Sequence, residues 1–353
     1  MIKTFDKLGC FLREVKKFYT HDKYISKNFL KFFPFFQKII KKITIENNWF
    51  RIEDLLITFD QWGETLKKEK LECWINKYSF LIAKKSKKIL VIMPGNIPMV
   101  GFHDFLCVLL SGHKIIIKLS KEDNLLIPFL CRIIIHEKPI LKNMIKFTNN
   151  VFYEEFDYVI ATGNNNTARY FEYFFRKYPI LLRKSRTSVS VLQGDETEEE
   201  LISLNQDILT YSGRGCRNVG KIFIPYGYDV HLILRKSFIS EYITKNYKYT
   251  DNYRYYLSIY IMNEVSFQRN HFVLFKEEKN DHSPISVVYY EFYENLNQVR
   301  KIILEKKNHI QCIVSKNFLE KEIPFGKTQH PKLEDYADEI DTIEFLTGYF
   351  NMN

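Results

Sequence analysis

Three apolar runs, each followed by a turn rich in Gly, Asn or Pro and then by a segment of helical periodicity, constrain this chain most. They span Ile89–Met93, Ile115–Leu119 and Tyr158–Ala161, and the helical segments that follow are 101–110, 124–137 and 168–177. Runs that are apolar throughout are typical of parallel strands buried on both faces. The alternation of strand, turn and helix therefore predicts an open α/β sheet of the dinucleotide-binding kind.

The length of 353 residues exceeds what one small core needs and predicts two packed domains. Residues 1–82 form a helical N-terminal segment in this prediction, and its three Trp are expected in the core. Residues 83–205 are expected to be a nucleotide-binding domain, to which the tail 330–353 returns. A catalytic domain follows over 206–329. The predicted fold class is α/β, with two doubly wound parallel-sheet domains.

The formal net charge of +10 raises the question of nucleic-acid or anionic membrane partners. The Lys residues are spread along the chain with only short clusters, such as 84–88, so no binding patch for nucleic acid is expected. No apolar stretch reaches the roughly 20 residues of a membrane span, and residues 1–17 lack a secretory apolar core. The six Cys are scattered without a CxxC pair, so we expect reduced thiols, no metal site and a cytoplasmic location.

Cys216 lies in a short segment of small and basic residues. Gly213 and Gly215 precede it, and Arg214 and Arg217 stand on either side. Glycines let backbone amides approach a ligand, and neighbouring guanidinium groups favour the nucleophilic thiolate. The segment is compatible with a catalytic nucleophile that forms a covalent acyl intermediate, and also with a buried thiol in a turn.

Polar residues follow each of the three predicted strands. Asn96 stands between Pro94 and Pro98, which suits a fixed oxyanion donor or a simple tight turn. Lys118 ends the second strand, at the edge of a parallel sheet where ligands bind. The turn 163–167 opens a helix whose backbone amides would favour a diphosphate. No GxGxxG is present, so the ordinary dinucleotide fingerprint is missing.

The last part of the chain is dense in polar residues. After Pro324-Phe325-Gly326 come His330 and the acidic stretch 335–344. Because such a pattern does not suit a core, this tail is a candidate for function. His330 is a candidate proton donor, although a single His more often has a structural role.

These motifs, in this order, resemble the acyl-CoA reductase family related to the fatty acid reductase of bacterial bioluminescence, within the aldehyde dehydrogenase superfamily. The similarity runs from the region of Trp49 to the tail. Residues 95–98 resemble an early motif of the family and residues 213–216 its nucleophile segment. The tail positions that resemble the family's closing signature are Phe325, Gly326, Gln329, Pro331, Asp335, Tyr336, Ala337, Asp338, Asp341, Thr342, Phe345 and Leu346.

The resemblance implies a role for each matching position. Cys216 is the implied nucleophile and Asn96 the implied oxyanion-stabilising residue, while Arg214 and Arg217 are weaker candidates for substrate binding. The implied contacts to NADPH or NADH are Lys118, Ser120, Gly163, Asn164, Thr167, Phe325 and Gly326. Leu119 stands where the superfamily usually has Pro, which is a departure from its pattern.

A second departure concerns water activation. Hydrolytic aldehyde dehydrogenases carry a Glu in a Glu-Leu-Gly-Gly-type segment after a strand, and the matching region here, 191–196, has no clear equivalent apart from Glu196. We therefore expect a reductase that converts an acyl-CoA or acyl-carrier-protein thioester to the aldehyde. An aldehyde dehydrogenase or acyl-phosphate reductase using the same Cys is the alternative, and a non-enzymatic basic module the less favoured one. The superfamily's habit suggests a homodimer.

Overall fold

A computed structural model describes residues 1–21, 23–78, 85–235 and 243–348. The chain divides into two compact units, which we call unit 1 (Met1–Lys184 and Lys332–Asn353) and unit 2 (Ser185–Pro331). The division lies at Lys184, not after residue 205 as expected from the sequence. The reason is that the strand starting at Thr187 pairs with strands of the second sheet, so it and the helix after it belong to unit 2.

Unit 1 begins with helices, as expected for its N-terminal segment, although positions 79–82 of that segment lie outside the described residues. The helices are α1 (Ile2–Thr20), α2 (Phe33–Glu46), α3 (Ile52–Thr65) and α4 (Lys68–Asn76). Helices α1 and α3 cross closely at Gly9 and Gly63, because a Cβ at Gly9 would lie 2.9 Å from Leu66 Cβ. Trp74 is buried, whereas Trp49 and Trp62 are half-buried against the same core.

The sheet of unit 1 is parallel throughout and has the order β3-β2-β1-β4-β5. Its strands are β1 (Lys88–Ile92), β2 (Lys114–Lys118), β3 (Ile145–Phe147), β4 (Tyr158–Thr162) and β5 (Ile180–Arg183). The helices between them are α5 (Phe102–Leu110), α6 (Leu126–Glu137) and α7 (Asn165–Phe174). Short 3₁₀ turns flank β3 at Pro139–Asn143 and Val151–Tyr153.

Both faces of this sheet are buried, which explains the apolar runs in the sequence. Ile89 and Val91 pack into a core with α5 and α6, whereas Leu90 between them packs with Phe175 at the end of α7. Successive strand residues point to opposite faces, so a strand covered on both sides has to be apolar at every position.

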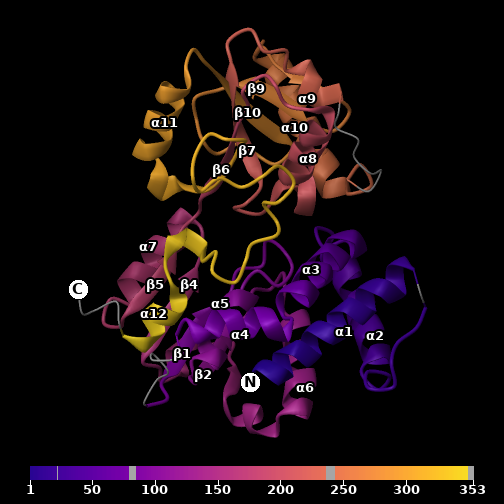
Figure 1. Ribbon diagram of the computed structural model, residues 1–353, viewed down its shortest axis with the longest axis vertical. Coiled ribbons are helices and arrows are strands. Elements are labelled where there is room, and N and C mark those ends of the chain that lie inside the picture. The colour runs from indigo at the N-terminus through magenta and orange to yellow at the C-terminus, as the bar shows by residue number, and fades with distance from the viewer. Residues whose placement is uncertain (22, 79–84, 236–242, 349–353) are drawn as a thin grey trace. The chain divides into compact units, whose positions relative to one another are not determined.

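The second sheet has the order β11-β6-β7-β10-β9-β8 and is parallel except for β8 against β9. Its strands β6, β7, β10 and β9 are labelled in Figure 1. Its strands are β6 (Thr187–Val191), β7 (Val219–Pro225), β8 (Gln268–Arg269), β9 (Leu274–Glu277), β10 (Val287–Tyr293) and β11 (Ile310–Val314). Its helices are α8 (Glu198–Leu209), α9 (His231–Arg235), α10 (Tyr247–Met262) and α11 (Leu296–Glu305), and 3₁₀ turns span Thr210–Gly213 and Lys307–His309. The acidic start of α8 forms a capping box between Thr197 and Glu200.

The tail belongs to unit 1 from Lys332 onward and ends in α12 (Thr342–Thr347), after a 3₁₀ turn at Ala337–Glu339. The buried guanidinium of Arg183 donates to Asp104 at 2.7 Å, to Thr342 Oγ1 at 2.8 Å and to Ala337 O at 2.8 Å. The indole of Trp74 donates to Tyr336. Tyr336 and Thr342 are buried, so these positions of the polar tail anchor it within unit 1.

Candidate functional site

In unit 1, the predicted site segments share one edge of the sheet. Strands β2, β1 and β4 are neighbours and run parallel, so the loop with Asn96, the strand end at Lys118 and the turn at Gly163 all lie at their carboxyl ends. The chain proceeds from β1 to β2 on one side and reaches β4 on the other, which makes β1 and β4 a topological switch point. Open α/β sheets bind ligands at such a point.

The loops after β1 and β2 touch each other at Gly95. A Cβ built on Gly95 would lie 2.6 Å from the Cβ of Ser120. The Met93 amide donates to Lys118 O at 2.9 Å, which continues the pairing of β1 with β2 into the loops. The structure thus brings together two of the segments singled out from the sequence, the Asn96 loop and the strand end at Lys118, with Asn96 half-buried next to this contact.

Asp123 links the same two loops and was not identified from the sequence. Its Oδ2 accepts the amide of Met99 at 2.9 Å, and Met99 has a left-handed backbone with φ of 56°. Burial raises the pKa of Asp123 to about 6, against the lowering effect of the Met99 amide. Its other oxygen, Oδ1, is buried and has no hydrogen-bond partner. A buried carboxylate thus holds the end of the Asn96 loop.

At the end of β4, Gly163 and Asn164 lead into α7 as expected. Asn164 is the N-cap residue of α7, and its Oδ1 accepts the amide of Thr167 at 2.8 Å. Asn164 is exposed and lies at the positive end of the helix dipole. Lys118 is half-buried, and its ammonium group donates to Leu119 O at 3.1 Å. Both positions carry positive potential suited to an anionic ligand.

In unit 2, Cys216 is exposed and follows a run of left-handed residues. Tyr211, Ser212 and Gly213 have φ of 55°, 57° and 71°. The hydroxyl of Ser188 in β6 donates to the carbonyl of Cys216 at 2.8 Å, which fixes the backbone at the Cys. Left-handed residues other than Gly are uncommon and mark functional turns.

Asn218 holds this turn together and was missed by sequence analysis. Its Oδ1 accepts the amide of Gly215 at 2.8 Å. Its Nδ2 donates at 2.9 Å to the carbonyls of Asp207 and Thr210, at the carboxyl end of α8. We call residues 210–218 the nucleophile turn, after the role that the sequence leads us to expect of Cys216. Side-chain hydrogen bonds from Ser188 and Asn218 hold its backbone around Cys216.

Exposure distinguishes Cys216 from most of the other cysteines. Cys107, Cys131 and Cys312 are buried, and burial raises the thiol pKa of Cys107 and Cys131, so those groups stay protonated. Cys73 is exposed but lies on α4.

Of the Arg residues beside Cys216, Arg217 donates to Cys312 Sγ at 3.3 Å. The amide of the half-buried Arg214 donates to the carbonyl of Tyr211 at 3.2 Å, within the nucleophile turn.

Phe325 and Gly326 also lie in unit 2, on a loop packed against α8. Gly326 has φ of 77°, and a Cβ there would lie 3.0 Å from Ser203 Cβ. Its amide donates to Asp207 Oδ2 at 2.6 Å. The loop is therefore attached to the helix that leads into the nucleophile turn.

The sequence left open whether Glu196 activates water and whether His330 donates a proton, and the structure shows the surroundings of both side chains. The Glu196 carboxylate accepts the amides of Gln193 and Gly194, the second at 3.1 Å, and burial raises its pKa. Its oxygens are thus engaged by the loop after β6. His330 is exposed, and its amide donates to Lys327 O at 3.0 Å.

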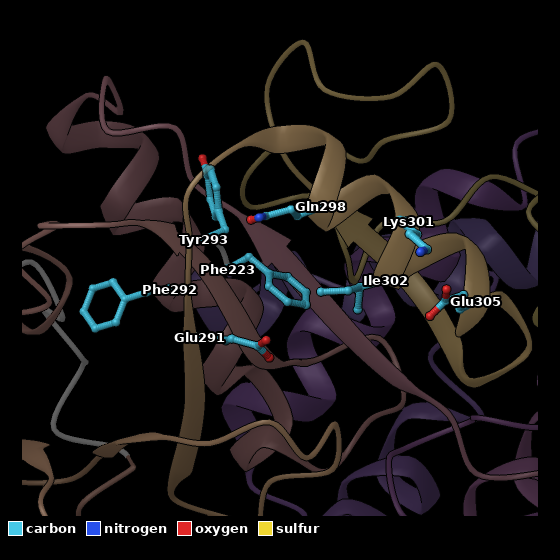
Figure 2. A pocket seen from close by; sticks show the side chains of 8 residues that line it. All are labelled: Phe223, Glu291, Phe292, Tyr293, Gln298, Lys301, Ile302 and Glu305. Carbon is cyan, nitrogen blue, oxygen red and sulfur yellow. The ribbon is translucent and has the colours of Figure 1, made fainter.

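A cavity of about 420 Å³ lies between α11 and the strands β7 and β10, and no predicted site residue lines it. In Figure 2, Phe223 and Ile302 face one another across it, while Phe292 points away. Glu291 at its wall accepts from the fully buried Lys221 at 2.6 Å. This ion pair gives the carboxylate of Glu291 a partner within the protein.

Neither a protein-family model nor a curated protein matches the sequence, whereas solved structures match the fold. An indole-3-acetaldehyde dehydrogenase from P. syringae, in complex with NAD+, has a TM-score of 0.63 at 10% identity, covering 91% of this chain and 73% of that one. An aldehyde dehydrogenase from Bacillus cereus has a TM-score of 0.59 at 12% identity, covering 89% of this chain and 70% of that one. The chain has the aldehyde dehydrogenase fold. A betaine aldehyde dehydrogenase from Staphylococcus aureus has the same fold, with a TM-score of 0.58 at 11% identity, covering 88% of this chain and 70% of that one.

Among the described residues, no helix is both long and apolar enough to cross a bilayer. Nor does that part of the chain bring three His, Cys, Asp or Glu side chains together in a way that would hold a metal ion.

Proposed function

We propose that the protein is an NAD(P)H-dependent reductase that converts an acyl thioester, carried by CoA or a carrier protein, to the aldehyde through a Cys216-bound acyl group. The observation that carries this proposal is the exposed thiol of Cys216 on the glycine-flanked, left-handed nucleophile turn of an aldehyde dehydrogenase fold. An accessible thiol on a braced backbone is what covalent acyl transfer requires.

The chain's own residues account for the acyl-transfer half of the reaction. The Cys216 thiolate attacks the thioester carbonyl, a C–S bond to Cys216 forms, and the bond to the CoA or carrier thiolate breaks. The Cys216 amide is the proposed donor to the oxyanion. Arg214 and Arg217 add positive potential near the thiolate and the substrate phosphates.

The carboxyl edge of the sheet in unit 1 suits a dinucleotide. Lys118 supplies a cation at a strand end, and the amino end of α7 at Asn164 and Thr167 faces solvent with its positive dipole. Gly95 and Gly163 keep the backbone close to Ser120 and Thr167, which leaves no room for larger side chains. A bound nicotinamide would supply hydride to the acyl carbon, after which the C–S bond to Cys216 breaks and the aldehyde leaves.

The placement of Glu196 supports reduction over hydrolysis. Both of its oxygens accept backbone amides of its own loop, those of Gln193 and Gly194. A carboxylate held in this way is less available as a base for water. If Glu196 does not activate water, the acyl group on Cys216 is left for hydride transfer.

Mass spectrometry of the intact protein after exposure to a series of acyl-CoA esters tests the proposal. We expect one acyl adduct on Cys216, lost on addition of NADPH or NADH with equimolar aldehyde. Cys216→Ala should remove both the adduct and the aldehyde, whereas Cys73→Ala, which replaces the exposed Cys of α4, should retain them. An adduct on the Cys216→Ala protein, or none on the wild type, would refute the proposal.

An aldehyde dehydrogenase is the second candidate, because structural neighbours are aldehyde dehydrogenases, and an acyl-phosphate reductase would use the same Cys216. Product analysis separates these activities, because steady formation of acid from aldehyde and NAD(P)+ indicates oxidation. Loss of that acid in Glu196→Gln would then assign Glu196 as the base.

A further inference from the structure

We propose that Asp207 is a positioning residue that holds the Phe325–Gly326 loop on α8, the helix leading into the nucleophile turn. Through this loop, the Asp207 side chain serves hydride transfer rather than acyl transfer. This inference rests on the proposed function and on the role that the family resemblance implies for Phe325 and Gly326, as contacts to the nicotinamide cofactor. Asp207 itself is buried at the end of α8 and is not expected to touch substrate or cofactor.

The carboxylate of Asp207 is occupied entirely by the loop that follows β11. Oδ2 accepts the amide of Gly326 at 2.6 Å, and Oδ1 accepts the amide of Thr328 at 3.0 Å and its hydroxyl at 2.7 Å. Hydrogen bonds to a charged acceptor are about twice as strong as neutral ones, and here three converge in a site closed to water. The loop therefore takes its position from one side chain.

The Phe325–Gly326 loop packs so closely against α8 that it has little freedom to move. The left-handed backbone of Gly326, with φ of 77°, turns the chain toward α8, where Ser203 would lie 3.0 Å from an added Cβ. A shift of the loop away from α8 would break the bond of the Gly326 amide to Asp207. Phe325, the neighbouring residue, would move with it.

The backbone of Asp207 has a separate task from its carboxylate. Its carbonyl accepts Asn218 Nδ2, which braces the nucleophile turn. A change confined to the side chain leaves this bond in place. Asp207 variants can therefore separate the loop from the turn, although both are tied to the same residue.

Asp207→Asn makes that separation. The Asn carbonyl oxygen can still accept from Thr328, but its amide group then faces the Gly326 amide, donor against donor. We expect the acylation rate of Cys216, followed by CoA release in a burst, to stay near that of the wild type. Steady-state aldehyde formation should fall on the order of tenfold to a hundredfold, with a raised KM for the nicotinamide, because a buried bond to a charged acceptor is lost.

The control is Glu199→Gln, which removes an exposed carboxylate from the first turn of the same helix and should change neither rate. An equal fall in acylation and aldehyde formation in Asp207→Asn would overturn the proposal, as would no change in either. If Asp207→Asn does not fold, Thr328→Val and Thr328→Ser decide. Thr328→Val loses the hydroxyl donor and should slow aldehyde formation alone. Thr328→Ser keeps the donor and should restore the rate of aldehyde formation. Equal rates in the two variants would also overturn the proposal.

The same assays distinguish failure of this inference from failure of the proposed function. A wild-type protein that forms no acyl adduct refutes the function. Hydrogen exchange at the amides of Gly326 and Thr328 then still reports on the loop, and it should accelerate in Asp207→Asn but not in Glu199→Gln. Unchanged exchange at both amides would refute the positioning role on its own.

Discussion

Gly95 lies against Ser120 so closely that a Cβ on Gly95 would be 2.6 Å from Ser120 Cβ. The backbone of the loop after β1 thus lies directly against the Ser120 side chain of the loop after β2. This contact determines how the Asn96 loop sits beside the strand end at Lys118, and it depends on the smallest residue at position 95.

Gly95→Ala should lower both stability and nicotinamide affinity. The added methyl group overlaps Ser120 and forces the two loops apart, and overpacking of this kind typically costs about 1–3 kcal/mol. Denaturant unfolding and NADPH fluorescence titration measure the two effects. Ser120→Gly in the Gly95→Ala background removes the overlapping atoms and should restore much of the stability. A double variant no more stable than the single one would contradict the steric explanation.

Asn218→Ala should weaken the nucleophile turn. The substitution leaves the Gly215 amide and the carbonyls of Asp207 and Thr210 without their buried partner, at a cost of about 2–4 kcal/mol in the free energy of unfolding. The acylation rate of Cys216 should fall with it, measured as CoA release. Asn297→Ala, an exposed Asn on α11, is the matched control and should leave both values unchanged.

Asp123 should give the stability a distinct pH dependence. Burial raises its pKa to about 6 in the folded state, from 3.8 when unfolded, so folding favours the protonated carboxyl. Its contribution is greatest below pH 4 and is lost as the pH rises through 6, amounting to at most about 3 kcal/mol. Asp123→Asn still accepts the Met99 amide and cannot ionise. The variant should therefore gain stability relative to wild type between pH 4 and 7 in urea unfolding, and a difference independent of pH would contradict this assignment.

Arg183→Met should release the tail of unit 1. The variant leaves the buried Asp104 carboxylate without its cation and removes the donors to Ala337 and Thr342, at a cost of about 3–5 kcal/mol. Protease cleavage within 332–341 should accelerate. Lys184→Met removes only an exposed ion pair with Glu172 and should cost less than about 1 kcal/mol, so equal effects of the two variants would argue against the buried network.

Periodicity was sufficient to predict the regular elements near the site. The strands β1, β2 and β4 and the helices after them were expected within a few residues, because strands covered on both faces are apolar throughout. The strands β3 and β5 were not expected, since β3 has only three residues and β5 ends in Arg183. Arg183 is buried only because Asp104 and Thr342 come to it from distant parts of the chain.

The bracing residues of the site illustrate the same limit. Asp207 follows the polar pair Asn205-Gln206 near the end of α8, so no local signal marks it, and its partner Gly326 stands 119 positions further along the chain. Asn218 carries no local signal apart from its nearness to Cys216. Neither pairing follows from residue type, because many Asp and Asn in a chain of this length cap turns in the same way.

The amino-acid order alone was enough for the α/β class and for the polar ends of the strands, because these depend on local patterns of burial and backbone freedom. Cys216 as the candidate nucleophile came from its local segment together with the family resemblance. The tertiary structure decided which loops meet, where the units divide and which side chains hold the turn. Those outcomes depend on hydrogen bonds and packing between residues far apart in the chain, whose energies exist only once folding has excluded water from them.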